Sequence, residues 1–403
     1  MVVQPRRFLG RAIDWRIAFL PIAAIVVTAA FELTVGEDPL VPMHAAQTAV
    51  IPPAGASAAA PKAAATASTA RFLAPAGVAV RGNIVYVSDV ATNAIWAYDS
   101  ATETAVMITG FLGAGYSGDG DPAGQAQLTG PRGLALDAAG NLFIADSGNH
   151  VVRRIGAADR IVTTVAGTGS RGFSGDGGKA IWARLNTPTA VAFDSYGNLY
   201  IADTLNHRIR KVTKAGVIVT VAGSGAVSSV GRGTGGFGFS GDGGPAVQAQ
   251  LSIPEGVAID SKGNVYIADT GIDRIRKVDT KGIIRTVAGT GKNSYSNAGK
   301  SAVRTNLYAP VGMAIGPGGF LYFSERDHHV VRMISARGLV VAVAGRGSRG
   351  NSGDGGYATR AKLNDPQGIA FGPTGELFVA DTGNQRVREV APGGTIITIA
   401  WWT

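Results

Sequence analysis

An acidic residue followed seven positions later by arginine is the most regular chemical pattern in this sequence. Carboxylates repeated in this way could form a ring that binds a metal or another cation. Two residues at that spacing across a tight turn can instead meet as a cross-strand pair, which is worth about 0.2–1 kcal/mol. We favour this structural interpretation, because the pairs recur with the repeat itself. The pairs are Asp146 with Arg153, Asp203 with Arg210, Asp269 with Arg276, Glu325 with Arg332, and Asp381 with Arg388, while Asp89 is followed by Trp96.

A second pattern lies four residues after each acidic residue, at Asn93, His150, His207, Asp273, His329 and Gln385. Three histidines at equivalent places could suggest zinc. Separate copies of a repeat would hold them too far apart to share one ion, and Asn and His readily adopt the backbone angles of tight turns. We therefore expect a structural turn.

Glycine-rich loops carry the third pattern, a Gly-Asp-Gly sequence centred on Asp119, Asp176, Asp242 and Asp354. Carboxylate and carbonyl oxygens of such a loop could bind Ca²⁺. One aspartate per loop is a poor ligand set, and the same sequence forms a tight turn in which Asp accepts backbone N–H groups. We expect the turn, no metal and no cofactor, and keep Ca²⁺ as the weak alternative.

All three patterns belong to a unit that occurs six times. Its opening prolines are Pro75, Pro131, Pro188, Pro254, Pro310 and Pro366, at steps of 56, 57, 66, 56 and 56 residues. The long step contains an insertion at residues 226–235. Alternating apolar residues and turn signals divide each copy into four short strands. One four-stranded meander cannot bury both faces, whereas a closed ring of such sheets can. The sequence therefore predicts an all-β fold, a six-bladed β-propeller of four-stranded antiparallel blades at 71–403, with blades starting near residues 75, 131, 188, 254, 310 and 366.

In such a propeller the first strand of each blade lies nearest the axis. Its second residue should line the mouth of the central channel, and we call this set the mouth ring: Ala76, Arg132, Thr189, Glu255, Val311 and Gln367. Only Glu255 is acidic, and Arg132 opposes a cation, so the ring argues against a catalytic metal. We identify no catalytic residues and expect a binding surface that includes Arg132, Thr189, Glu255 and Gln367. In a meander the second turn of each blade and the connections between blades share one end, so we expect the loops on the same face.

The N-terminal 35 residues resemble an export signal. Four arginines precede an uncharged apolar run at residues 17–31, which is the pattern of a signal peptide. The run is shorter than the roughly 20 residues of a typical spanning helix. We therefore expect a hydrophobic helix at 1–35 that is either a cleaved signal or a membrane anchor. Residues 36–70, rich in Ala and Pro, should be a disordered linker.

Composition narrows the classes of partner. The chain has no cysteine, which excludes disulfides, thiolate metal sites and cysteine nucleophiles. The net charge of +9 permits nucleic acid or an anionic surface, but Lys and Arg are scattered over every copy. Export also argues against RNA, so no nucleic acid partner is expected.

The repeat resembles the NHL family. The matching residues are Asn149-His150 in the second copy and the run Asn206-His207-Arg208-Ile209-Arg210 in the third, each preceded by Ala-Asp. The joining segment at residues 164–180 resembles the variant found in bacterial secreted proteins and in the teneurin propeller. The resemblance covers residues 71–403 and implies the fold strongly and the function weakly. Copies one and five depart from the pattern.

Two functions follow as expectations. The first is a binding or protein-interaction module outside the cytoplasm, whether secreted, periplasmic or membrane-anchored, with a protein, peptide or glycan as ligand. The insertion, with Arg232 and the neighbouring Phe237 and Phe239, would be its first contact region. The alternative is a metal-dependent hydrolase or lyase of the gluconolactonase-like or peptide-amidating-lyase-like type. We favour the binding module.

Overall fold

The computed structural model describes residues 72–226, 240–294 and 299–400. These residues form six sheets, each with four consecutive antiparallel strands. Blade one has β1 (Pro75–Arg81), β2 (Ile84–Asp89), β3 (Ala94–Asp99) and β4 (Thr104–Thr109). Blade two has β5 (Pro131–Leu136), β6 (Leu142–Asp146), β7 (Val151–Ile155) and β8 (Val162–Ala166). Blade three has β9 (Pro188–Phe193), β10 (Leu199–Asp203), β11 (Arg208–Val212) and β12 (Ile218–Ala222).

The other three blades repeat this order. Blade four has β13 (Pro254–Ile259), β14 (Val265–Asp269), β15 (Arg274–Val278) and β16 (Ile284–Ala288). Blade five has β17 (Pro310–Ile315), β18 (Leu321–Glu325), β19 (Val330–Ile334) and β20 (Val340–Ala344). Blade six has β21 (Pro366–Phe371), β22 (Leu377–Asp381), β23 (Arg386–Val390) and β24 (Ile396–Ala400). Each predicted copy contains its four strands in full, because polar or glycine-containing turns separate the strands in the sequence.

Short 3₁₀ turns complete the units. Those between the second and third strands are η2 (Ser147–Asn149), η4 (Thr204–Asn206), η6 (Thr270–Ile272) and η10 (Thr382–Asn384). Those in the connections between blades are η1 (Ala123–Gln125), η3 (Ala180–Trp182), η5 (Ala246–Gln248), η7 (Ala302–Arg304) and η9 (Ala358–Arg360), and η8 (Pro317–Gly319) joins β17 to β18. Within the described ranges, no helix has the length and apolar character needed to cross a bilayer.

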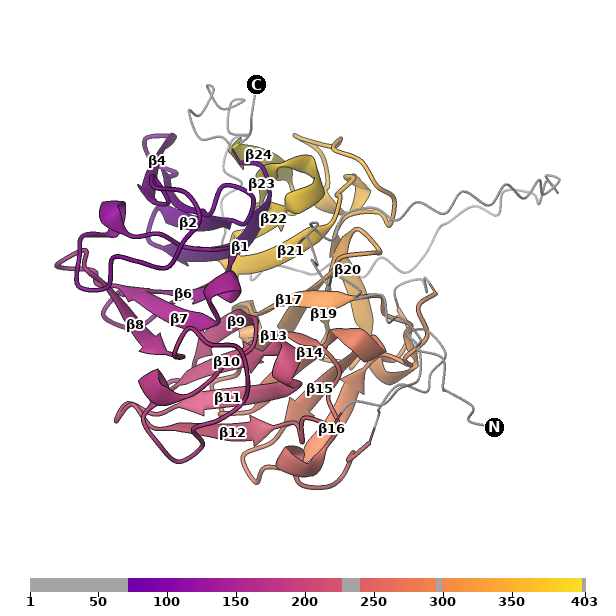
Figure 1. Cartoon of the computed structure of the whole chain (residues 1–403). Coiled ribbons are helices and arrows are strands. Elements are labelled where there is room, and N and C mark those ends of the chain that lie inside the picture. The colour runs from indigo at the N-terminus through magenta and orange to yellow at the C-terminus, as the bar shows by residue number, and fades with distance from the viewer. Residues whose placement is uncertain (1–71, 227–239, 295–298, 401–403) are drawn as a thin grey trace, which may run out of the picture. The chain divides into compact units, whose positions relative to one another are not determined.

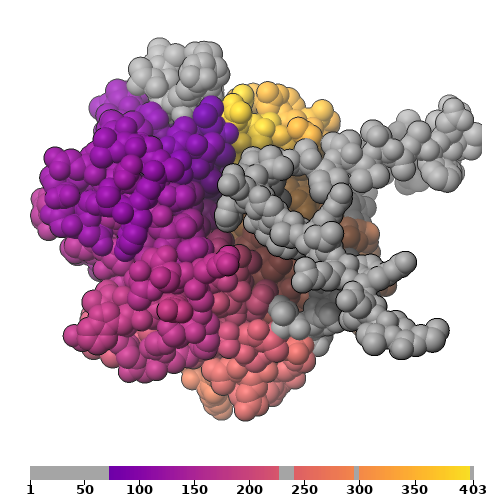
Figure 2. All heavy atoms as spheres, viewed as in Figure 1, coloured from indigo at the N-terminus to yellow at the C-terminus, as the bar shows by residue number. Residues whose placement is uncertain are grey.

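The blades follow one another round a closed ring. β5 packs between β1 and β9, and the series continues through β13 and β17 to β21, which packs back against β1. In Figure 1 the labelled first strands lie round the middle, whereas β4, β8, β12 and β16 lie at the outside. The space-filling view in Figure 2 shows the first three blades, coloured from indigo to magenta, adjoining one another. The predicted fold and number of blades are therefore confirmed.

The hydrophobic core lies between adjacent blades rather than inside any one of them. Phe143 and Val152 of blade two pack with Val191 and Ile201 of blade three, and similar clusters fill the other joints. The ring closes in the same way, since Phe72 and Val78 pack against Phe378 and Ile399. The apolar residue three positions before each opening proline is buried in every copy, as at Leu185.

Glycine brings the innermost strands close together. The third residue of the first strand is glycine in five blades, and the exception is Ala190 in blade three. A Cβ on Gly256 would lie 1.9 Å from the carbonyl oxygen of Val311, and one on Gly77 would lie 2.1 Å from that of Arg132. No real side chain tolerates such a distance, so these glycines set the narrow bore of the channel.

The connections between blades cover the outer strands. In the loop that leads into blade three, Lys179 bridges to Val217 and the N–H of Gly177 donates to Ile218. Asn206 in the turn of the same blade donates to the carbonyl of Gly172. The loops and turns therefore do share one face near the axis, as predicted. The loops that lead into blades two to six continue across the outer strand of the blade they enter and protect that edge from pairing with another chain.

Candidate functional site

The arginine of the acidic–arginine pattern is a buried structural group. Arg210 is fully buried, and its guanidinium lies 3.3 Å from Asp203 and 2.8 Å from Asp176. The register places Asp203 opposite Arg208 and places Arg210 two residues further along, opposite Ile201. The predicted pair is thus a diagonal contact, and the arginine is held between two carboxylates rather than one.

The same arrangement recurs in blades four and six, and blade two shares the contact with the loop aspartate. Arg276 lies 3.4 Å from Asp269 at the end of its hairpin strand and 2.6 Å from Asp242 in the preceding loop. For Arg388 the corresponding distances are 3.3 Å to Asp381 and 2.7 Å to Asp354. Arg153 lies 2.6 Å from the loop residue Asp119. Arg153 also donates to the backbone carbonyls of Gln127 and Ser117, while Asp146 bonds to Asn149. Each arginine lies 34 residues after the loop aspartate, and this connection was missed in the sequence.

These contacts give the glycine-rich loops a role different from the one expected. The second oxygen of Asp176 accepts from Thr220, and that of Asp354 accepts from Thr398. Asp242 accepts from the N–H of Thr286 in the same way. The predicted tight turn is present, since the N–H of Gly178 donates to the carbonyl of Gly175. The carboxylate of these described loops, however, does not accept from nearby N–H groups as we expected, and instead fastens the loop to the next blade through an arginine. In the described part of the chain, no three His, Cys, Asp or Glu side chains are grouped to hold a metal ion.

Blade five departs from this pattern. Glu325 takes the place of the aspartate and lies 3.2 Å from Arg332 and 2.5 Å from Nδ1 of His328. The residue 34 positions before Arg332 is Ala298 instead of aspartate. His328 therefore stands beside the carboxylate in the one arginine-bearing blade whose loop sequence has no acidic partner.

The turn position has the predicted backbone conformation in all six blades. Asn93, His150, His207, Asp273, His329 and Gln385 have φ between 54° and 57°. The three histidines also join blades, because their Nδ1 atoms accept from the N–H groups of Thr187, Ile253 and Asp365. Burial lowers the pKa of all three below the ordinary value. The Nδ1 atoms of the three histidines thus act as hydrogen-bond acceptors that join adjacent blades, which is a structural role.

A hydroxyl group makes a further link at each joint. In four blades the residue after the acidic one donates to the carbonyl of the next opening proline: Ser147 to Pro188, Thr204 to Pro254, Thr270 to Pro310, and Thr382 to Pro75 across the ring closure. Blades one and five have Val90 and Arg326 there. They use a serine two positions earlier, since Ser88 donates to Arg132 and Ser324 to Gln367.

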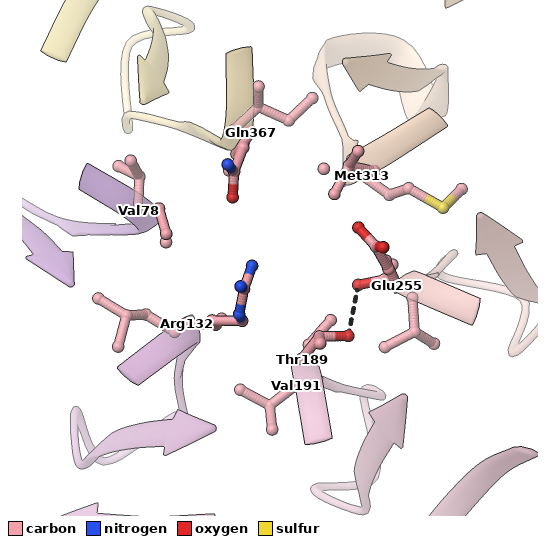
Figure 3. A pocket seen from close by; sticks show the side chains of 18 residues that line it. Val78, Arg132, Thr189, Val191, Glu255, Met313 and Gln367 are labelled. Atoms are coloured by element: carbon pink, nitrogen blue, oxygen red, sulfur yellow. Dashed lines mark hydrogen bonds between the residues drawn. The ribbon is translucent and has the colours of Figure 1, made fainter. Parts of the chain in front are cut away.

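The mouth ring lines the central channel, as the strand order requires. The second and fourth residues of all six first strands face a cavity of about 80 Å³. Below the mouth ring lies an apolar ring formed by Val78, Leu134, Val191, Val257, Met313 and Ile369. Figure 3 shows the side chains of Arg132, Glu255 and Gln367 pointing toward the middle of the channel. The binding role proposed for Arg132, Thr189, Glu255 and Gln367 stays a prediction.

Charged residues outside the mouth ring complete this site. Arg326, from the turn of blade five, lies 3.0 Å from Glu255 of blade four and 3.5 Å from Asp327. Burial acts to lower the pKa of Arg326, but Glu255, Asp327 and Asp365 together outweigh it and the net shift is upward. Burial raises the pKa of Asp365 to about 6. Sequence reasoning missed Arg326 and Asp365, although Arg326 stands where four other copies have Ser or Thr.

Arg132 differs from every other arginine near the axis. Its side chain is partly buried, yet it makes no hydrogen bond or ion pair with any described residue. Burial lowers its pKa, and the charges of Glu255 and Asp365 act in the opposite direction. The predicted contact residues Arg232, Phe237 and Phe239 lie outside the described residues, as do the N-terminal segment 1–35 and the linker 36–70.

Comparison with known proteins supports the repeat family. The family described as "Teneurin NHL domain" matches residues 169–234 and 237–298, and "NHL repeat" matches residues 128–155 and 363–389. Teneurin-3 of Mus musculus is 31% identical over 291 residues, which is 64% of this chain and 10% of that protein. Protein SUPPRESSOR OF QUENCHING 1, chloroplastic, of Arabidopsis thaliana is 29% identical over 274 residues, 64% of this chain and 25% of that protein. The chain thus matches only a tenth to a quarter of the length of these relatives.

Solved structures share the fold at low sequence identity. An auxiliary nutrient binding protein from Bacteroides thetaiotaomicron has a TM-score of 0.56 at 15% identity, covering 79% of this chain and 69% of that one. A streptogramin B lyase has a TM-score of 0.51 at 14% identity, covering 83% and 85%. Similarity at this level extends to the fold alone. The two family models, the six copies in the sequence and the six observed blades show that this chain is a β-propeller built from NHL repeats.

Proposed function

We propose that this propeller is an extracytoplasmic binding module whose ligand contacts the loop-bearing face at the channel mouth. The arrangement of the mouth ring carries the proposal. Its only carboxylate, Glu255, is already engaged by Arg326, so the ring lacks the set of free oxygen ligands that a catalytic divalent metal requires. Polar side chains above an apolar floor are instead typical of a recognition site.

The sequence outside the described residues supports the location. The basic and then apolar N-terminus is the pattern that directs the following residues out of the cytoplasm. The segment after it has the composition of a spacer. A rigid ring on such a spacer can present its loops to a partner without ordering a large part of its own chain.

Site-directed photo-crosslinking tests which face binds. Phe173 lies on the loop-bearing face beside Arg208, and Tyr196 lies in the turn between β9 and β10 at the opposite end; both are exposed. A photoreactive aromatic residue would replace each one separately in the full chain, within the native envelope.

We expect defined cross-linked products from position 173 and none from position 196. Products formed equally at both positions, or only at 196, would contradict a ligand on the loop-bearing face. A variant with the mouth blocked by Thr189→Trp should lose the products from position 173, provided that its urea midpoint stays at the wild-type value.

A further inference from the structure

Resting on the proposed function, we infer that the channel mouth binds the C-terminal carboxylate of a peptide through Arg132. The inference starts from the state of the charged groups. Each buried arginine of the blade pattern has a carboxylate beside it, and Arg326 has Glu255 at 3.0 Å. Arg132 alone projects into the channel without a hydrogen-bond partner among the described residues (Figure 3).

A guanidinium in this position favours a planar anion. Its N–H donors form a fork that matches the two oxygens of a carboxylate. The apolar ring beneath, with Val78, Val191 and Met313, keeps the local environment less polar than water, which strengthens such a contact. Glu255 does not compete for Arg132 as a free carboxylate would, because Arg326 holds it.

The small volume of the channel restricts what can enter it to the terminal residue of a peptide. A volume of about 80 Å³ is far below the roughly 300–1,000 Å³ of pockets that enclose a whole small molecule. It accommodates a carboxylate and a small side chain, while the rest of the ligand stays above the mouth. The lining contains no aromatic side chain on which a sugar ring could stack.

The side-chain amide of Gln367 supplies a hydrogen-bond acceptor for the last peptide N–H of such a ligand. It lies across the channel from Arg132 in Figure 3, and its own contact is a long one, 3.4 Å from Asp365. Its amide can therefore turn to the last peptide N–H while Arg132 contacts the carboxylate. Recognition of a free carboxylate terminus is an established mode of peptide binding.

The experiment measures binding of N-acetyl-alanyl-alanine to the full chain by calorimetry and ligand-observed NMR. The matched probes are its C-terminal amide and glucuronate. The variants are Arg132→Gln, Arg132→Lys, and the control Arg285→Gln, which removes the same charge from an exposed position on the outer strand β16. Urea midpoints establish that all three variants are folded.

We expect the free acid to bind wild type and Arg285→Gln equally and its amide at least about tenfold more weakly. Arg132→Gln should lose at least about tenfold and Arg132→Lys less, because a charge-assisted hydrogen bond is lost in the first and the paired geometry in the second. Equal binding of acid and amide, an unaffected Arg132→Gln, or tighter binding of glucuronate than of the peptide would overturn the inference. If no probe binds while the cross-links at position 173 persist, the inference fails and the proposed function stands. If both are absent, both fail.

Discussion

Replacing Arg276 by methionine tests whether the buried arginine–carboxylate contacts hold each blade to its loop. The side chain of Arg276 is fully buried between Asp269 and Asp242 and also donates to the carbonyls of Gln250 and Ser240. Methionine fills similar space without donors and leaves Asp269 buried without the arginine that bonds to it, although the charge of Arg274 still acts on it. Breaking a buried ion pair by removing one partner costs about 3–5 kcal/mol, so we expect the free energy of unfolding at pH 8 to fall by that amount.

The loss should depend on pH in a defined direction. Burial raises the pKa of Asp269 to about 7, and Arg276 acts against this shift. Without the arginine the folded-state pKa rises further above the unfolded value, so the cost of the charged carboxylate is present above the folded pKa and disappears as protonation neutralises it. The difference between variant and wild type should therefore be smaller at pH 5.5 than at pH 8.

Urea denaturation followed by tryptophan fluorescence, at both pH values, measures the effect. Arg285→Met is the control, because Arg285 is 61% exposed and a surface ion pair contributes little. If Arg276→Met and Arg285→Met unfold at the same urea concentration at pH 8, or if the loss is greater at pH 5.5, the reasoning is wrong.

Four further predictions concern the joints, the bore and metal. Because burial lowers the pKa of His207, this side chain binds fewer protons in the folded than in the unfolded state below pH of about 6.5 and so opposes folding there; His207→Asn, which places there the residue found at position 93, should therefore raise the urea midpoint relative to wild type by more at pH 5 than at pH 7, and an equal difference at both pH values would count against the neutral acceptor. Thr270→Val removes the hydroxyl that bonds to Pro310 and should cost about 1 kcal/mol or more, whereas the exposed Thr280→Val should cost little; equal effects would disprove the link. Gly256→Ala should destabilise by about 1–3 kcal/mol through overpacking, and Gly393→Ala, with open space around it, should not; a stable Gly256→Ala would mean that the bore can widen. Excess chelator should leave the urea midpoint unchanged, because arginines engage Asp176, Asp242 and Asp354; a lower midpoint would reveal a structural metal.

Local patterns in the sequence were sufficient for the blades. Alternation and turn signals recur within about 25 residues, so the strands, the αL residues of the turns and the residues of the mouth ring could be placed from spacing alone. The acidic–arginine pattern was recognised, but only as a hairpin contact between residues seven apart.

Contacts that join different units were harder to foresee. The partner of Arg210 at Asp176 lies 34 residues earlier, in a loop that single-copy reasoning treats as an isolated turn. A signal was present: the spacing is constant in four copies, and Arg332, where it is broken, has Glu325 and His328 instead. Arg326 was missed because no motif marks its position, which holds Ser or Thr in four other copies, and only the packing of adjacent blades brings it to Glu255 of blade four.

In blade five, Ser324 makes the hydroxyl bond to the next blade from a different position, and this allows blade five to differ from the other blades near the axis. Ser324 takes over the bond to the next blade that Thr270 and its equivalents make elsewhere. The residue two places along is thereby released from holding the ring together. Position 326 can therefore hold an arginine that reaches Glu255 near the axis. Because Ser324 keeps the bond to the next blade, blade five carries this extra charge without losing its link in the ring.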